Sequence, residues 1–475
     1  MMSSLWQALS GMLLICTIAA ADTPARPELE VVFHLPFDGS IEAASGGHVT
    51  ITGGEDIRFV EGKIGQAADL RASGSVEYHN LPALDMQSGT IEFWINSTHD
   101  GRHMEDRFYL QFLRDDGQGG IEAKFYHVEC SIQATIWGEA VTNRRYGWGW
   151  AQGAWQHIAF TWDTADPELA GLKLYRNGVE SGYPCSYKPV APPDFLRVGY
   201  KSAAEPISAS ALIDEVVVYN RALFREQIKT LYEAGEQPLE QRLIAVRERI
   251  SADEARKSYL TDQLFNHTRF GFIHGRYQSM ANWSEKVFAT LGLPVPEPID
   301  ETELATTDMG QYDVLLVGGG GGLRLDEANA EALRQYVRSG GGYVGICGGA
   351  ISAASCGLIE AERYNFGARG PVWGIPREHP ITEGYDIPQK ILFPHASGPL
   401  FVIHEDSDEV PVVLFDVGNP PLPTFVNAIA RQYGEGRVAV FSGHPEGSAE
   451  THRLLRNAIM WAAGIVAIEE QATAR

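Results

Sequence analysis

The stretch Tyr343-Val344-Gly345-Ile346-Cys347-Gly348-Gly349 is an apolar run that stops at a cysteine set between glycines. Small residues that suit a helix follow it. This pattern is typical of a strand that turns sharply into a helix, because glycines beside the turn residue leave room for a strained backbone. The N-terminal dipole of such a helix would favour a thiolate and lower the pKa of the Cys347 thiol. The stretch therefore predicts a nucleophile elbow in a domain of strands and helices.

Strand and helix patterns alternate on both sides of this elbow, from Arg269 onward. The strand-like runs lie at 270–273, 312–317, 343–346, 412–415 and 437–441, and the helical patterns lie at 282–291, 326–338 and 448–463. This order predicts a mostly parallel sheet covered by helices. We therefore expect a three-layer α/β domain over residues 267–466, with a frayed tail at 467–475.

A base and an orienting acid are offered by His444-Pro445-Glu446. Pro445 favours an extended conformation for His444, and residues two apart in an extended segment project to the same side. Glu446 could then hold one imidazole nitrogen while the other nitrogen faces the thiol. The sequence predicts Cys347 as nucleophile, His444 as general base and Glu446 as orienting acid.

Five glycines, Gly318 to Gly322, end the strand-like run that precedes them. The backbone N–H groups of Gly319 and Gly320, together with that of Gly348, are predicted to stabilise a developing oxyanion. Phosphate binding fits badly, because no Lys-Ser or Lys-Thr pair follows the run and the spacing GxGxxG fails at Leu323.

In this order, the glycine run, the elbow and the His-x-Glu motif resemble the class I glutamine amidotransferase superfamily. Within it, the chain is most similar to the N-terminal domain of biotin-protein ligases, through residues 341–350, 397–402, 434–437 and 442–446. The resemblance implies a flavodoxin-like fold, the triad roles given above and a substrate pocket at Ser397 and Gly398.

The continuation of the elbow departs from that family. Members that hydrolyse glutamine usually have GHQ where this chain has Gly349-Ala350-Ile351, so glutamine is not supported as the substrate. The leading hypothesis is a Cys-dependent hydrolase that cleaves an amide or related acyl bond in a small, peptide-like substrate through a thioester. The alternative is a non-catalytic carbohydrate-binding or adhesion protein with an inactive amidotransferase-like fold.

The N-terminal half has a different pattern, with short β-rich runs separated by Gly, Asn, Asp and Pro. This pattern predicts an antiparallel β-sandwich, with Trp94 and Trp155 in its core. Residues 28–235 resemble a laminin-G-like (concanavalin A-like) jelly roll. The matching stretches include 37–40, 62–67, 93–94, 155–159, 177–178, 213–216 and 219–223. The resemblance implies that this half binds a glycan or another cell-surface ligand.

Two sets of residues in this half are candidates for binding. Tyr146, Trp148 and Trp150 could form a stacking platform for sugar rings, although core packing is the favoured role for any one of them. Asp38 and Asp214 could share a structural calcium ion, or they could serve as turn and cap residues. His379, His395 and His404 lack the spacing of zinc ligands, so we expect no metal or other cofactor in catalysis.

The first residues of the chain predict its location. Residues 1–21 are predicted to be a signal peptide, since a short apolar stretch ends in three alanines before Asp22. The segment has no Lys or Arg, and a lipoprotein site at Cys16 fits less well. We expect a secreted or periplasmic protein with no membrane span. Residues 236–266 are predicted to be a helical linker, and Pro238 is expected to break the helical stretch at 222–262 into two pieces.

Charge and cysteine content narrow the partners further. The net charge of -23 argues against nucleic acid and anionic membranes as partners. Too few cysteines remain after cleavage for a disulfide-built scaffold. Pairing of Cys130 with Cys185 stays open. Cys347 and Cys356 would lie about 13 Å apart on a helix, which is beyond disulfide reach.

Overall fold

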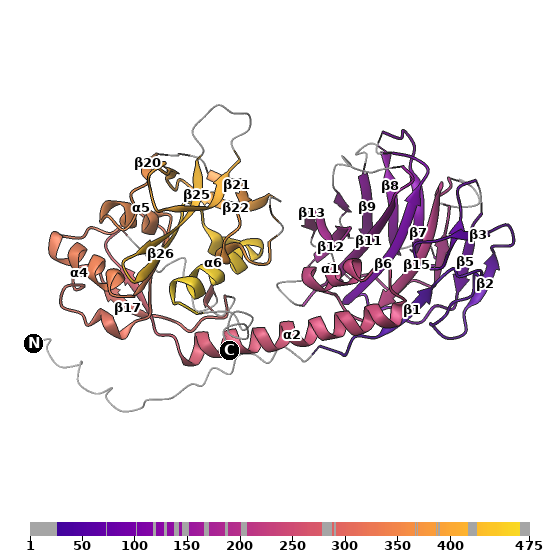
Figure 1. The fold of residues 1–475 in the computed structure, drawn as a ribbon, viewed down its shortest axis with the longest axis horizontal. Coiled ribbons are helices and arrows are strands. Elements are labelled where there is room, and N and C mark those ends of the chain that lie inside the picture. The colour runs from indigo at the N-terminus through magenta and orange to yellow at the C-terminus, as the bar shows by residue number, and fades with distance from the viewer. Residues whose placement is uncertain are drawn as a thin grey trace, which may run out of the picture.

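The computed structural model consists of two folded units joined by a long helix, α2 (Leu239–Asn266) (Figure 1). It describes residues 26–72, 74–100, 102–116, 120–127, 131–136, 142–144, 152–165, 171–185, 189–200, 207–277, 287–288, 291–365, 367, 369–385, 387, 390–416 and 425–465. The predicted signal peptide and tail lie outside these residues, as does most of the helix predicted at 282–291. Within the described part of the chain, no helix is both long and apolar enough to cross a membrane.

The first unit is built from two antiparallel sheets. The first sheet has the order β13 (Val179–Cys185), β12 (Gly171–Arg176), β11 (Trp155–Asp163), β6 (Ser88–Ser97), β15 (Ala211–Tyr219), β4 (Gln66–Asp69) and β3 (Arg58–Glu61), and β1 (Val31–Leu35) also pairs with β15. The second sheet has the order β10 (Thr142–Arg144), β9 (Ser131–Ile136), β8 (Gly120–Tyr126), β7 (Arg107–Leu113), β14 (Phe195–Val198), β5 (Val76–His79) and β2 (Thr50–Gly53). This arrangement confirms the predicted antiparallel sandwich.

The core of this unit lies between the two sheets. In β6, Ile91, Phe93 and Ile95 point into it, as the two-residue period of a strand requires. Trp94 points to the other face, where it is 3% exposed and stacks near Tyr232. Trp94 is therefore buried as predicted, although under a helix. The prediction for Trp155 is wrong, because the first residue of β11 lies at the rim and is only half-buried.

Helix α1 (Arg225–Glu233) and the first turns of α2 cover the outer face of the first sheet. Arg242 of α2 is fully buried there, and its guanidinium donates to Glu92 of β6 at 2.8 Å and to Glu215 of β15 at 2.5 Å. The Tyr219 hydroxyl and Nε2 of His157 also lie within hydrogen-bond distance of the Glu92 carboxylate, at 2.6 and 2.7 Å. Helix α2 begins directly after Pro238, where the sequence predicts a break.

The second unit is a mixed sheet. Its order is β17 (Glu297–Asp300), β16 (Phe270–His274), β18 (Val314–Val317), β19 (Gly342–Ile346), β26 (Gly436–Phe441), β25 (Val426–Tyr433), β24 (Val410–Phe415), β21 (Arg369–Pro376) and β22 (Ile391–Ala396). Two short strands extend it, since β23 (Leu400–Val402) pairs with β25 and β20 (Glu362–Tyr364) pairs with β23. Pairs from β17 to β26 are parallel, and the rest are antiparallel.

The prediction of a mostly parallel sheet is thus wrong for its second half. For β25 and β26 the reason is the length of their connection. Only Gly434 and Glu435 join β25 to β26, and Gly434 takes a φ of +65°. A two-residue connection can only form a hairpin, which makes the two strands antiparallel. A parallel neighbour needs a crossover of about a dozen residues.

Helices pack on both faces of this sheet. Side chains that alternate along the parallel strands form two cores. One core includes Leu260 and Leu264 of α2 and the inner face of α6 (Ala449–Ala462). The other core includes Leu333 and Val337 of α4 (Glu327–Arg338) and Ala350 of α5 (Gly348–Ser355). Short 3₁₀ turns lie at Met309–Gln311, Pro380–Thr382 and Pro445–Gly447.

Candidate functional site

Cys347 lies at the turn between β19 and α5, with φ of 51° and ψ of -101°. A positive φ is unfavourable for a residue with a side chain, so the surrounding structure must hold this conformation. Its N–H donates to the Phe441 carbonyl at 2.8 Å. A Cβ on Gly345 would lie 2.7 Å from the backbone of Gly349, and one on Gly349 would overlap the Val317 carbonyl. The glycines are therefore required for the tight turn.

His444 and Glu446 form a buried pair. Nδ1 of His444 lies 2.7 Å from Oε1 of Glu446, whose side chain is 5% exposed. The sequence predicts that an extended segment makes this contact. The structure instead has a 3₁₀ turn at Pro445–Gly447. The backbone N–H of His444 donates to the Pro394 carbonyl at 2.7 Å, which fixes the start of this turn. Nε2 is buried and makes no well-aligned hydrogen bond, so it is free to serve the thiol.

The structure brings the thiol and the imidazole together. Burial raises the pKa of the Cys347 thiol, but the nearby imidazole of His444, its charge, and the N–H groups of Gly320 and Gly348 together lower it below the ordinary value. Burial lowers the pKa of His444, and its contacts with Cys347 and Glu446 raise it well above the ordinary value. These shifts favour a thiolate beside an imidazolium.

The glycine run has two roles. The N–H groups of Gly320 and Gly348 help to lower the pKa of the Cys347 thiol, and an oxyanion formed beside this sulfur would need donors in the same place. Gly319 instead packs against the imidazole, since a Cβ there would lie 2.7 Å from Cε1 of His444. A side chain at this position would push the base away from the thiol.

Ser397 and Gly398 lie beside the segment that carries His444. A Cβ on Gly398 would overlap the Ser442 carbonyl, so these two backbones are in direct contact. His395, which the sequence analysis excluded only as a zinc ligand, is buried with Nε2 3.3 Å from the Ser442 hydroxyl. Asn427 accepts from the N–H of Gly443 at 3.2 Å. These contacts hold the backbone before His444 in place.

The cysteines and the remaining candidates in the first unit are only partly described. Tyr146, Trp148, Trp150 and Cys130 lie outside the described residues. Cys347 and Cys356 are both free, as predicted, and both are buried. Burial raises the pKa of the Cys356 thiol to about 11, so this thiol does not share the activation of Cys347.

Asp38 and Asp214 hold a turn at residues 62–66. Oδ2 of Asp214 accepts from the N–H groups of Lys63 and Ile64 at 2.8 and 3.0 Å. Oδ1 of Asp38 accepts from the N–H of Gln66 at 2.7 Å. Among the residues that the structure describes, no three acidic, histidine or cysteine side chains gather closely enough to hold a metal. The turn role is therefore what these contacts support directly, and the calcium ion stays a prediction.

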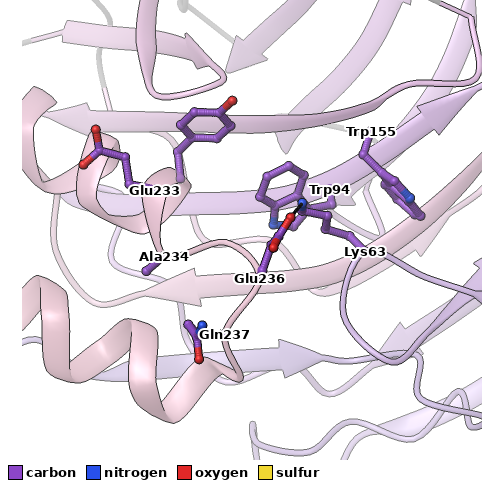
Figure 2. A pocket seen from close by; sticks show the side chains of 8 residues that line it. Lys63, Trp94, Trp155, Glu233, Ala234, Glu236 and Gln237 are labelled. Carbon is purple, nitrogen blue, oxygen red and sulfur yellow. Dashed lines mark hydrogen bonds and ion pairs between the residues drawn. The ribbon is translucent and has the colours of Figure 1, made fainter.

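A cavity of about 350 Å³ opens between the first sheet and the end of α1 (Figure 2). Its lining includes Lys63, Trp94, Trp155, Tyr232 and Glu236. Nζ of Lys63 lies 5.0 Å from the Trp94 ring centre and 2.9 Å from Oε1 of Glu236. The sequence analysis missed this cavity because its walls come from segments far apart in the chain.

Comparisons with known proteins bear on the first unit. Residues 70–229 match a laminin G family model described as the concanavalin A-like lectin/glucanases superfamily. Similar solved structures include domain 4 of AbnA, a GH43 extracellular arabinanase from Geobacillus stearothermophilus, in complex with arabinotriose. The match between the two chains has 21% sequence identity and a TM-score of 0.35, and it covers 43% of the present chain and 98% of the arabinanase domain.

Two toxin domains are also similar in structure. The botulinum neurotoxin serotype D binding domain is 13% identical, covers 43% of this chain and 51% of that chain, and has a TM-score of 0.35. The binding domain of Paraclostridial Mosquitocidal Protein 1 is 13% identical, with 43% and 52% covered and a TM-score of 0.34. The chain thus spans about half the length of these toxin domains. No curated protein matches it. Residues 70–229 form a concanavalin A-like jelly-roll domain.

Proposed function

We propose that the jelly roll binds carbohydrate and that the chain acts as a glycan- or surface-binding protein. The observation that carries this proposal is the match of residues 70–229 to a family of lectins and glucanases. The cavity under α1 supports it, because its volume of about 350 Å³ suits a ligand of one or two sugar rings. The half-buried face of Trp155 offers an aromatic surface for sugar C–H groups, and Lys63 and Glu236 offer partners for hydroxyls.

A glycan array probed with the full chain tests this function. For the best ligand found, Trp155→Ala should weaken binding about tenfold, which corresponds to about 1.4 kcal/mol, because the stacking face is lost. Trp155→Phe keeps an aromatic face and should retain most of the affinity. Equal affinity of the parent and Trp155→Ala would remove this cavity from consideration, and a null array would overturn carbohydrate binding itself.

A second candidate function rests on the strained Cys347 and its lowered pKa. We propose that the second unit has a class I glutamine amidotransferase-like fold, related to the N-terminal domain of biotin-protein ligases. Support comes from the parallel half of its sheet, from the elbow and from the 2.7 Å contact between His444 and Glu446. In this proposal the unit hydrolyses an amide or ester bond.

The chemistry follows from the positions of the groups. The Cys347 thiolate attacks the carbonyl carbon, and the electron pair moves to the oxygen, which the N–H groups of Gly320 and Gly348 stabilise. Collapse of this intermediate breaks the bond to the amine or alcohol, which takes its proton from the His444 imidazolium. A thioester on Cys347 remains. Water deprotonated by His444 then cleaves the thioester, releasing a carboxylic acid and regenerating the thiol.

A library of amides, esters and peptides tests hydrolysis. We expect turnover that Cys347→Ser abolishes, together with an acyl adduct on Cys347 in the intact-mass spectrum. Turnover that survives in Cys347→Ser would assign the activity to another group. If no library member is cleaved and no adduct forms, the chain is a binding protein whose second unit does not catalyse this reaction.

We also propose that the chain is exported, on the basis of residues 1–21. N-terminal sequencing of protein recovered from the medium or periplasm should find Asp22 as the first residue. Recovery from the cytosol with residues 1–21 intact would contradict export.

A further inference from the structure

Two arginines and a tyrosine form an exposed cluster at the edge of the glycine run. Tyr277 is 48% exposed, and the guanidinium groups of Arg276 and Arg324 lie 5.5 and 5.3 Å from the centre of its ring. The cluster joins two loops, one after β16 and one after the glycine run. Both cations thus contact the same ring.

This cluster lies next to the candidate nucleophile. The N–H of Gly321 donates to the Tyr277 carbonyl at 2.8 Å, so the Tyr277 backbone is in contact with the glycine run. The same run contacts the elbow and the base: the N–H of Gly349 donates to the Gly318 carbonyl at 3.0 Å, and a Cβ on Gly319 would lie 2.7 Å from Cε1 of His444. A ligand held over Tyr277 would lie at the mouth of the triad.

A buried carboxylate fixes both loops. Glu301 is 5% exposed, and its two oxygens accept from the backbone N–H groups of Arg276 and Arg324 at 3.0 and 2.6 Å. The carboxylate therefore orients the two backbones and is occupied by them. It positions the arginine side chains without neutralising them by an ion pair.

Within the described part of the chain, neither guanidinium group makes an ion pair, although the protein as a whole has a net charge of -23. An anion that reaches both cations would gain from the attraction of each. Guanidinium groups also bind carboxylate, sulfate and phosphate oxygens in a two-pronged geometry.

We propose that Arg276 and Arg324 bind an anionic group of the substrate and so select anionic amides or esters for attack by Cys347. The proposal rests on the second candidate function, hydrolysis by Cys347. In this arrangement the anionic group lies between the guanidinium groups, and the adjoining apolar part of the substrate packs on the exposed face of Tyr277. The scissile carbonyl then reaches the sulfur and the N–H groups of Gly320 and Gly348.

Alkylation of the full chain by two reagents of similar size tests the selection without knowledge of the substrate. Iodoacetate is an anion and iodoacetamide is neutral, and in both cases the thiolate displaces iodide and forms a thioether. We expect the rate ratio of iodoacetate to iodoacetamide at Cys347 to exceed that of free cysteine about fivefold at low salt, as two nearby cations would give. The ratio should approach that of free cysteine in ~1 M salt.

Variants separate this proposal from the function on which it depends. Arg276→Gln with Arg324→Gln should slow iodoacetate about fivefold and leave iodoacetamide unchanged, while Lys at both positions should retain the ratio. Arg58→Gln with Arg363→Gln removes the same charge from exposed sites elsewhere and should change neither rate. A parent ratio equal to that of free cysteine, or equal slowing of both reagents in the double variant, would overturn anion selection. Failure of iodoacetamide to label Cys347 faster than a model thiol would instead overturn the nucleophile itself.

Discussion

Cys347 combines a strained backbone with an activated side chain. Its positive φ is tolerated because the Phe441 carbonyl holds its N–H and because two glycines allow the close approach of β18 and α5. The same turn places the thiol where His444 and two backbone N–H groups lower its pKa. Strain of this kind costs about 1–3 kcal/mol and is often found at functional sites.

The shifted pKa values of this pair predict an unusual pH dependence of thiol reactivity. A lowered thiol pKa keeps Cys347 ionised as the pH falls below the ordinary thiol value, until the pH passes through the folded-state pKa. The raised pKa of His444 keeps its proton as the pH rises above the ordinary histidine value, until the pH passes through its own folded-state pKa. Between these limits the iodoacetamide rate at Cys347 should be nearly constant.

His444→Ala tests this pH dependence. The variant removes the imidazole and the charge that lower the thiol pKa, so the midpoint of reactivity should move up by about one pH unit or more. Mass spectrometry of labelled peptides distinguishes Cys347 from Cys356, and Cys347→Ser supplies the background. An unchanged midpoint in His444→Ala would show that the imidazole does not activate the sulfur.

Much of this site could be predicted from the sequence. The elbow, Gly320 and the His-x-Glu motif are recognisable because each is a short local pattern with a chemical meaning. Glu301, Arg276 and Arg324 could not be predicted in the same way. They lie in loops without periodicity, and only the parallel pairing of β16 with β17 and β18 brings them together.

Helix α2 is anchored to the jelly roll by a buried charge. Burial alone would raise the pKa of Glu92, but Arg242 and the hydrogen bond from His157 keep it well below the ordinary value. Glu215 accepts from the other arm of the same guanidinium. These partners are completely or almost completely buried, so each charge depends on the others to offset the free-energy cost of its removal from water.

Arg242→Met should therefore destabilise the first unit by about 3–5 kcal/mol, because it leaves two buried carboxylates without their cation. Denaturant unfolding followed by tryptophan fluorescence measures this change. Arg249→Met on the same helix is the matched control. Its ion pair with Asp253 is partly exposed, and its loss should cost less than about 1 kcal/mol. Equal effects of the two variants would contradict the anchor.

The strands and helices differ in how well the sequence predicts them. The parallel strands β16, β18 and β19 are continuous apolar runs, as strands buried on both faces require. Strand β25 has no counterpart among the predicted strands. Its neighbour β24, and β21 beyond it, contain prolines, and composition does not reveal the register of their antiparallel pairing.

The whole molecule depends on α2 as a shared element. Its first half packs on the jelly roll through Val246 and Ile250, and its last turns pack in the second unit through Leu260 and Leu264. The helix runs along one side of both units (Figure 1). Arg225 of α1 adds a direct contact, since it donates to Glu180 of the jelly roll at 2.9 Å and to the Gly384 carbonyl of the second unit at 2.5 Å. The two candidate sites are therefore held at a fixed separation.

Ala255→Pro tests whether α2 sets this separation. Residue 255 is exposed between the two packed ends of the helix, so a proline there breaks the helix at a cost of about 3 kcal/mol without disturbing either core. We expect the distance distribution from small-angle X-ray scattering to broaden, while glycan binding and iodoacetamide labelling stay at parent levels. Ala255→Lys keeps the helix and should reproduce the parent profile. An unchanged distribution in Ala255→Pro would mean that contacts such as that of Arg225, and not the continuous helix, fix the two units relative to each other.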